Sequence, residues 1–189
     1  MYKLCKTEQS AARQKQFEQC LLTLMQKSKF EDISISDLCG QFQIPRKSFY
    51  RYFTSKEGAL IALIDHTIME FEQPVSGKEV DCQSLPLVDL KQYFVFWRDH
   101  KKLLIALERS HLTNLLVERS TQHAVQERLM PRYLLSMPAE TQKMALTFMI
   151  CGLLSMVIQW HRGGYLQSPD EMVKLVTMML KTPLLSNEK

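Results

Sequence analysis

The chain has 189 residues, of which 46% are apolar and 23% are charged, as is typical of a globular protein with a buried core. The low content of glycine (6) and proline (7) argues against disorder, and a mean hydropathy of −0.17 excludes an integral membrane protein as a whole. The net charge of +4 is uneven, because residues 1–60 hold 10 basic and 6 acidic side chains whereas residues 61–189 hold 14 of each. A basic excess in one segment is either a solvated surface or a face that meets phosphate.

The cysteine pattern indicates a reducing compartment. The five cysteines are odd in number and show no CxxC spacing, so they predict neither a disulfide framework nor a zinc site. Residues 1–16 lack the apolar stretch of a signal peptide. We therefore expect a cytoplasmic protein that needs no metal or other cofactor.

The N-terminal third predicts three helices. The first covers residues 8–28, where apolar side chains recur at helical spacing on one face. The second begins after Ser34, a favourable N-cap with Asp37 three residues on, and runs to about Gln41. The third covers residues 46–52 and has a proline at its entry, where a missing N–H costs nothing.

The rest of the chain continues the helical period. A long helix follows Thr54 or Ser55 and reaches about Phe71, and the prolines and glycine of residues 73–86 predict a loop. Helical spacing resumes at Leu87, with a break expected near Ser110. Two further helices are predicted at residues 139–162, stopped by two glycines, and at residues 169–181, before Pro183.

The second and third helices have the pattern of a helix-turn-helix. Its inner side is apolar, and the helix that faces outward carries donors for base edges and phosphates. Candidates for base contact are Arg46, Lys47 and Ser48, which lie in the first turn of that helix. Candidates for phosphate contact, which fixes register rather than sequence, are Ser34, Ser36, Tyr50, Tyr52 and Lys56. The residues proposed for the inner side are Leu38, Cys39, Phe42, Ile44, Phe49 and Tyr52.

These residues also carry a family resemblance. The segments ISISDL (33–38) and IPRKSFYRYFTSKE (44–57) resemble the DNA-binding domain of TetR-type transcriptional regulators. The resemblance is specific over about residues 8–65 and architectural beyond them. It implies an all-α protein with a three-helix DNA-binding domain at residues 1–54 and a helical ligand-binding and dimerisation bundle at residues 55–189. It also implies a homodimer, formed through the helices at 139–162 and 169–181, that binds double-stranded DNA.

Two residues depart from the family pattern at the entry to the third helix. Gln43 stands in the turn, where the family usually has glycine, so we expect either backbone strain or an altered turn. Pro45 stands where the family often has serine or threonine, which removes a capping hydroxyl and a phosphate donor.

The segment from Met144 to Trp160 is almost free of charge. It is short for a membrane span and contains polar residues such as Thr147 and Gln159, so we interpret it as a helix buried by its own domain and by a partner chain.

The sequence does not favour an enzyme. Glu108 and His111 form one E-x-x-H pair, whereas a di-iron bundle requires two such pairs and two further glutamates. Phosphate-binding loops and nucleophile elbows are also lacking. The function predicted is that of a repressor released from a palindromic operator by an unknown small-molecule effector. Residues suggested for the effector pocket, or alternatively for plain core, are Phe94, Trp97, His111, Met149 and Trp160.

Two alternatives remain at this point. The chain is either an effector-responsive regulator or a DNA-binding dimer without a small-molecule response, controlled by a protein partner or by abundance. A third possibility, a helical bundle that only binds proteins, would be excluded if the chain selects a palindromic site from random duplex DNA.

Overall fold

The computed structural model describes residues 2–3, 5, 7–41, 43–72, 90–126 and 136–181. Within these ranges the fold is all-α, as predicted: nine α-helices and one short 3-10 helix are accompanied by a single isolated bridge between Tyr2 and Phe53. The predicted loop at 73–86, together with Phe42 and Pro183, lies outside the described residues.

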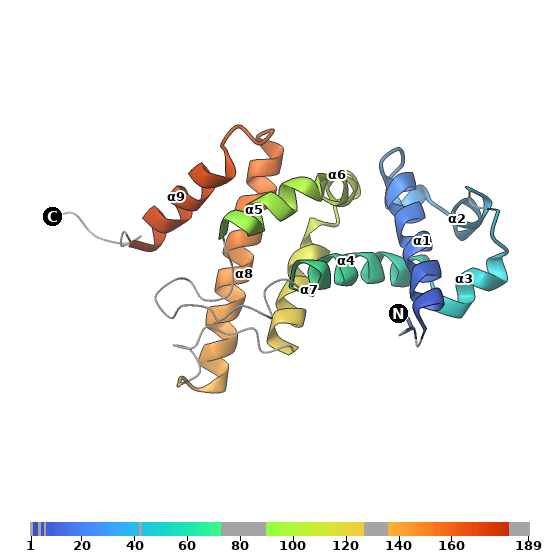
Figure 1. Ribbon diagram of the computed structural model, residues 1–189, viewed down its shortest axis with the longest axis horizontal. Coiled ribbons are helices and arrows are strands. Elements are labelled where there is room, and N and C mark those ends of the chain that lie inside the picture. Colours follow the sequence, from blue (N-terminus) through green and yellow to red (C-terminus); the bar gives the residue numbers. More distant parts are fainter. Residues whose placement is uncertain are drawn as a thin grey trace.

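The N-terminal helices gather at one end of the molecule (Figure 1). They are α1 (Glu8–Met25), the 3-10 helix η1 (Phe30–Asp32), α2 (Ile35–Gln41) and α3 (Arg46–Tyr52). Thr7 caps α1 by accepting a hydrogen bond from the backbone of Ser10 at 3.2 Å. These helices enclose an aromatic cluster of Phe17, Phe49 and Phe53, each at most 1% exposed.

Helix α4 (Lys56–Glu72) leads from this unit into the remainder of the chain, and both α1 and α7 pack on it. Figure 1 shows α4 running across the middle of the molecule. The helices that follow are α5 (Leu90–Asp99), α6 (Lys101–Arg109), α7 (Thr113–Gln126), α8 (Ala139–Arg162) and α9 (Pro169–Lys181). The predicted break near Ser110 is confirmed, because α6 ends there and α7 begins at Thr113.

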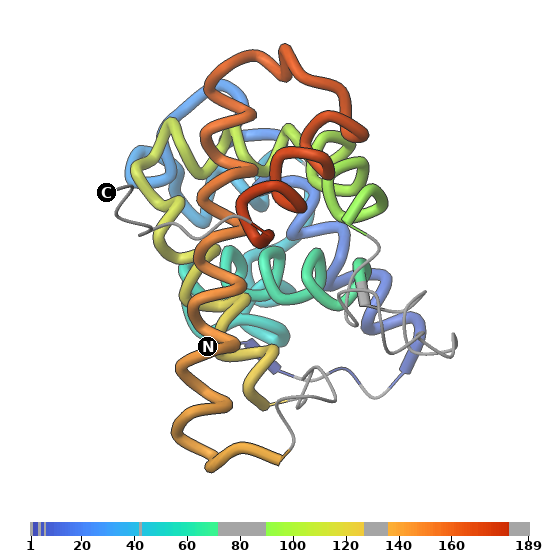
Figure 2. Tube along the Cα trace, turned by 90° about the vertical axis from the view of Figure 1, so that its left-hand side faces the viewer, coloured from blue at the N-terminus to red at the C-terminus, as the bar shows by residue number. Residues whose placement is uncertain are grey.

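The C-terminal helices continue the same apolar core, because one cluster of buried side chains extends from Phe17 of α1 to Val176 of α9. Phe94 of α5 meets Trp160 of α8 edge to face, with ring centroids 5.6 Å apart. α7 packs along α8, and α5 packs against α9. In Figure 2, which looks onto this end of the molecule, α8 and α9 lie nearest the viewer. α9 begins with a capping box, in which Ser168 and Glu171 exchange hydrogen bonds.

Candidate nucleic-acid interface

Reciprocal hydrogen bonds fix the start of α2. The carboxylate of Asp37 accepts from both the backbone N–H and the hydroxyl of Ser34, at 2.8 and 2.6 Å, and the Asp37 N–H donates to the Ser34 oxygen at 3.1 Å. These hydrogen bonds lower the pKa of Asp37. The capping box expected from the sequence is thus present, and the Ser34 hydroxyl serves α2 as well as being a candidate for DNA.

The turn between α2 and α3 holds Gln43 in the left-handed region, at φ 51°. The next amide, of Ile44, donates back to the Cys39 carbonyl at 2.9 Å, which closes the end of α2. The strain expected for a residue other than glycine is therefore present, since a Cβ in this conformation crowds the following carbonyl. Pro45 caps α3 with no side-chain hydrogen bond, also as expected.

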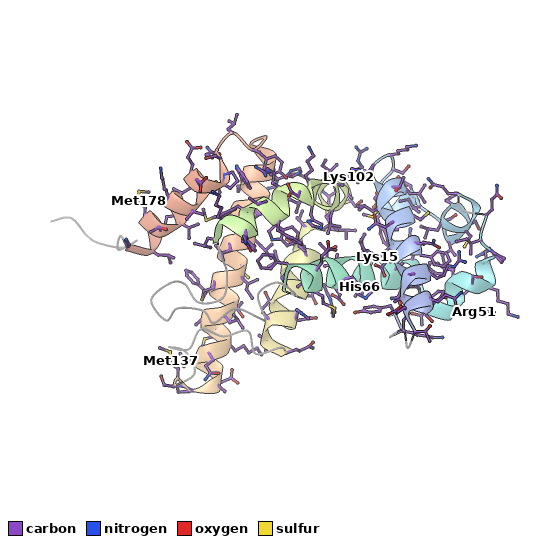
Figure 3. The ribbon with its side chains drawn as sticks, viewed as in Figure 1. Lys15, Arg51, His66, Lys102, Met137 and Met178 are labelled. Carbon is purple, nitrogen blue, oxygen red and sulfur yellow. The ribbon has the colours of Figure 1, made fainter. Side chains whose placement is uncertain are left out.

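Helix α3 has one buried and one open side. Phe49 is fully buried and packs edge to face on Phe17, with ring centroids 5.5 Å apart. That contact orients the opposite side of α3 outward, and the helix contains no acidic residue. The exposed side chains of α3 are Arg46, Lys47, Tyr50 and Arg51. Figure 3 shows Arg51 projecting at this end of the molecule.

The remaining candidates differ in exposure. Ser36 is exposed on α2, and Ser48 is half-buried. Tyr52 is also half-buried, with its ring against Phe17 at a centroid distance of 6.1 Å. The structure brings these residues to the same end of the molecule as the cations of α3, while their contacts with DNA remain predictions.

Lys56 is the clearest departure from the sequence prediction. Its ammonium group donates to the backbone carbonyls of Phe30, Glu31 and Ile33 at 2.7, 2.9 and 2.7 Å, and lies 4.7 Å from the centre of the Phe30 ring. An ammonium group has three hydrogens, so all of its donors are used within the chain. We therefore correct the predicted role of Lys56. Instead of contacting phosphate, its side chain links the start of α4 to the segment before α2.

The N-terminal segment contributes to this end in a way that sequence reasoning missed. The backbone N–H of Lys3 donates to the carbonyl of Tyr52 at 2.9 Å, beside the bridge between Tyr2 and Phe53. The side chain of Lys3 is exposed, which adds a cation near the last turn of α3. A two-residue bridge has no periodic pattern, so no signal in the sequence could have revealed it.

Comparisons with known proteins agree with this geometry. Residues 89–182 match a family model of the TetR group, TetR_C_8, described as a transcriptional regulator C-terminal region. A stretch of 63 residues is 40% identical to the HTH-type transcriptional regulator EthR of Mycolicibacterium smegmatis. The chain belongs to the TetR family of transcriptional regulators. The stretch shared with EthR is 33% of this chain and spans 28% of the length of that relative.

Solved structures of TetR-type regulators share the fold. The fatty acid degradation regulator FadR from Bacillus halodurans superposes with a TM-score of 0.58 at 16% identity, over 96% of this chain and 98% of that chain. The TetR family repressor AlkX from Dietzia sp. strain DQ12-45-1b, implicated in biodegradation of n-alkanes, gives 0.51 at 16% identity, over 88% and 92%. A TetR/AcrR-family regulator from Thermobifida fusca gives 0.51 at 18% identity, over 93% and 100%.

The suggested effector-pocket residues of this TetR-type chain do not share one environment. Phe94, Trp97 and Trp160 are core side chains with 0, 3 and 4% exposure. Met149 is half-buried. His111 is exposed, with φ 56°, because it follows the end of α6 in the left-handed conformation, and it therefore does not lie among the three core side chains.

The E-x-x-H pair of the sequence is also separated. Glu108 pairs with Arg162 at 2.6 Å and with His161 at 3.5 Å, both on α8, while His111 lies at the surface. Across the part of the chain that the structure describes, no group of three or more His, Cys, Asp or Glu side chains could hold a metal ion.

Helices α8 and α9 leave large apolar side chains uncovered. On α8, Met144 and Phe148 are 66% and 71% exposed, and on α9, Met178 and Leu180 are 57% and 59% exposed. Met178 lies at the opposite end of the molecule from Arg51 (Figure 3). By length and composition α8 could cross a membrane, with a mean hydropathy of 1.5 and 22% of that stretch buried. Exposed apolar side chains gathered on two helices make this surface a candidate for contact with another apolar surface.

Proposed function

We propose that this TetR-type regulator binds a near-palindromic operator as a homodimer and represses transcription from it. The observation that carries the proposal is the outward side of α3, where three cations and a tyrosine stand exposed with no acidic residue in the helix. Arg46 and Lys47 lie in its first turn, which enters the major groove in other helix-turn-helix proteins. A cytoplasmic location is part of the proposal.

The second half of the proposal is the dimer. The exposed apolar residues of α8 and α9 would pair with the same helices of a second chain, since an isologous contact needs one self-complementary patch. Burial by a partner also accounts for the apolar composition of α8 without a membrane. The domain division at residues 54 and 55 belongs to the same proposal, with DNA contact in the first part and pairing in the second.

The third part is the effector. A small molecule bound in the C-terminal bundle would favour a dimer with wrongly spaced α3 helices, and DNA would be released through a coupling free energy. FadR is named a fatty acid degradation regulator and AlkX is implicated in n-alkane degradation, so a thermal-shift screen should include aliphatic chains alongside cationic metabolites. If no compound shifts the melting temperature, the alternative of a dimer without a small-molecule response is favoured.

Selection of bound sequences from random duplex DNA tests the DNA-binding function. We expect enrichment of one inverted repeat, and binding that weakens steeply with salt. Lys47→Ala should cost about 1–3 kcal/mol at one base position if Lys47 contacts a base, and weaken all sequences evenly if it contacts phosphate. Failure to enrich any sequence would contradict the proposal.

A further inference from the structure

A buried carboxylate on α4 joins three separate segments of the chain. Asp65 is 3% exposed, and Arg119 of α7 donates to both of its oxygens, from Nε at 2.7 Å and from Nη2 at 2.6 Å. The hydroxyl of Tyr2 donates to the same carboxylate at 3.0 Å. A buried charge of this kind needs all of its partners, because the loss of one leaves it uncompensated.

Tyr2 connects this carboxylate to the end of the reading helix. Its backbone pairs with Phe53, and the next amide, of Lys3, donates to the carbonyl of Tyr52, the last residue of α3. Burial and the nearby carboxylate raise the pKa of Tyr2 to about 12, so its hydroxyl remains a donor at neutral pH. One residue thus touches α4 through its side chain and the end of α3 through its backbone.

We propose that Tyr2, Asp65 and Arg119 form a coupling device, in which the N-terminal segment passes changes at α7 to the end of α3. When α7 is displaced, Arg119 moves away from Asp65. The Asp65 carboxylate and the Tyr2 side chain bonded to it then shift. This shift weakens the backbone pairing of Tyr2 and Lys3 with Phe53 and Tyr52, which stabilises the last turn of α3. Tyr2 is therefore a positioning residue for DNA reading, which is the one point at which this inference rests on the proposed function.

A second connection between the two parts of the chain serves as an internal comparison. Gln26 of α1 donates to the Lys102 carbonyl at 2.9 Å, and the hydroxyl of Ser110 accepts from the Phe30 amide at 2.9 Å. Both hydrogen bonds join a neutral side chain to a backbone atom, and neither involves a residue of α3. Their loss should loosen the contact between α1 and α6 and leave the Lys3 amide unchanged.

Hydrogen exchange on the full chain tests the device without DNA. In Arg119→Gln, the amides of Lys3 and Phe53 should exchange about fivefold faster, in the range expected when a coupled contact is lost. Arg119→Lys, which keeps the charge but loses the bidentate geometry, should fall between this variant and the wild type. The matched control is Arg98→Gln, which breaks an exposed ion pair with Asp99 and should change neither amide.

The double variant decides whether Tyr2 carries the effect. Tyr2→Phe keeps the ring and removes the donor, so Arg119→Gln should add little further exchange at Lys3 and Phe53 in that background. If Arg119→Gln accelerates only the amides of α4 and α7, or if the two substitutions add independently, the proposal is overturned. Should Arg119→Gln unfold the chain, the same comparison is made with Arg119→Lys.

The consequence for DNA is measured separately. On the duplex enriched by the wild type, Tyr2→Phe should weaken binding several-fold, whereas Gln26→Ala should not. Unchanged affinity in Tyr2→Phe would overturn the role of Tyr2 in DNA reading. If the wild type enriches no duplex, the proposed function fails, and the exchange experiment still decides whether the coupling exists.

Discussion

The two ends of the molecule differ in the kind of side chain that they expose to solvent. Around α3 the apolar side chains are enclosed, with Phe49 fully buried, and the outward side is cationic. Along α8 and α9 large apolar side chains are open to solvent instead, because Phe148 is 71% exposed and Met178 is 57% exposed. The first end thus encloses its apolar side chains and presents cations to solvent, whereas the second presents large apolar side chains to solvent.

The largest expected effect is on the enclosed core. Phe49→Ala should lower the free energy of unfolding by about 3–5 kcal/mol, because it leaves a cavity among the rings of α1 and α3. Phe148→Ala, at a side chain largely in solvent, should cost the isolated chain far less. Urea denaturation at low protein concentration measures both, and equal losses would show that the two ends do not differ as described.

The second prediction concerns the apolar end. Phe148→Glu should shift the chain toward a monomer in sedimentation experiments, because it places a charge on the exposed apolar surface of the proposed contact. Ala12→Glu adds the same charge on an exposed position of α1 and should leave the association state unchanged. A wild type that sediments as a monomer at all concentrations would contradict the dimer.

The third prediction separates two lysines at the cationic end. Lys56→Met should lower stability by about 1–3 kcal/mol, because the carbonyls of Phe30 and Ile33 lose a charged donor. Lys47→Met should leave stability nearly unchanged and reduce the salt dependence of DNA binding. Thermal unfolding and salt titrations measure the two properties, and a loss of salt dependence in Lys56→Met without destabilisation would restore its predicted role at phosphate.

The fourth prediction is a pH dependence at the contact between α1 and α4. His66 donates to the buried carboxylate of Glu18 at 3.0 Å, and this hydrogen bond raises the pKa of His66. Because the folded pKa lies above the unfolded value of about 6.5, the added stability is complete below that value and is lost as pH rises through the folded pKa.

The measurement is the difference in stability between the wild type and His66→Gln from about pH 6 to pH 8. This difference should shrink as pH rises. His111→Gln, at an exposed histidine, is the control and should show no such trend. If the difference in the free energy of unfolding between the wild type and His66→Gln is constant across this range, the pair of His66 and Glu18 does not contribute a pH-dependent stability.

The smallest expected effect is at the turn. Gln43→Gly should raise stability by up to about 1 kcal/mol, since glycine adopts a positive φ without a Cβ clash. Gly40 lies on α2 with open space around its Cβ position, so Gly40→Ala is a useful comparison for the helix itself. A loss of stability in Gln43→Gly would indicate that the Gln43 side chain makes a compensating contact.

Local signals predicted most of the fold. The helix boundaries followed from Pro45, from the pair of Ser34 and Asp37, and from the two glycines after residue 162, because capping and φ restrictions depend on neighbours in the chain. The outward-facing role of α3 followed from the helix-turn-helix pattern. Long-range contacts could not be predicted, since nothing near Lys56 in the sequence indicates that its ammonium would meet carbonyls 23 to 26 residues away.

His111 shows the same limit in the C-terminal part. The sequence suggested His111 for the effector pocket or for the core, but α6 ends before it and its side chain is exposed to solvent. Periodicity predicts a face only as long as the helix continues. The network of Asp65, Arg119 and Tyr2 had no local signal, because its members are 54 and 63 residues apart from Asp65.

The stoichiometry of the complex with the selected duplex tests the central claim most directly. Native mass spectrometry should show two chains on a duplex with both half-sites, and inserting about five base pairs, half a helical turn, between them should abolish tight binding. One chain per duplex, with an affinity that the insertion leaves unchanged, would contradict a dimer that reads DNA through two α3 helices.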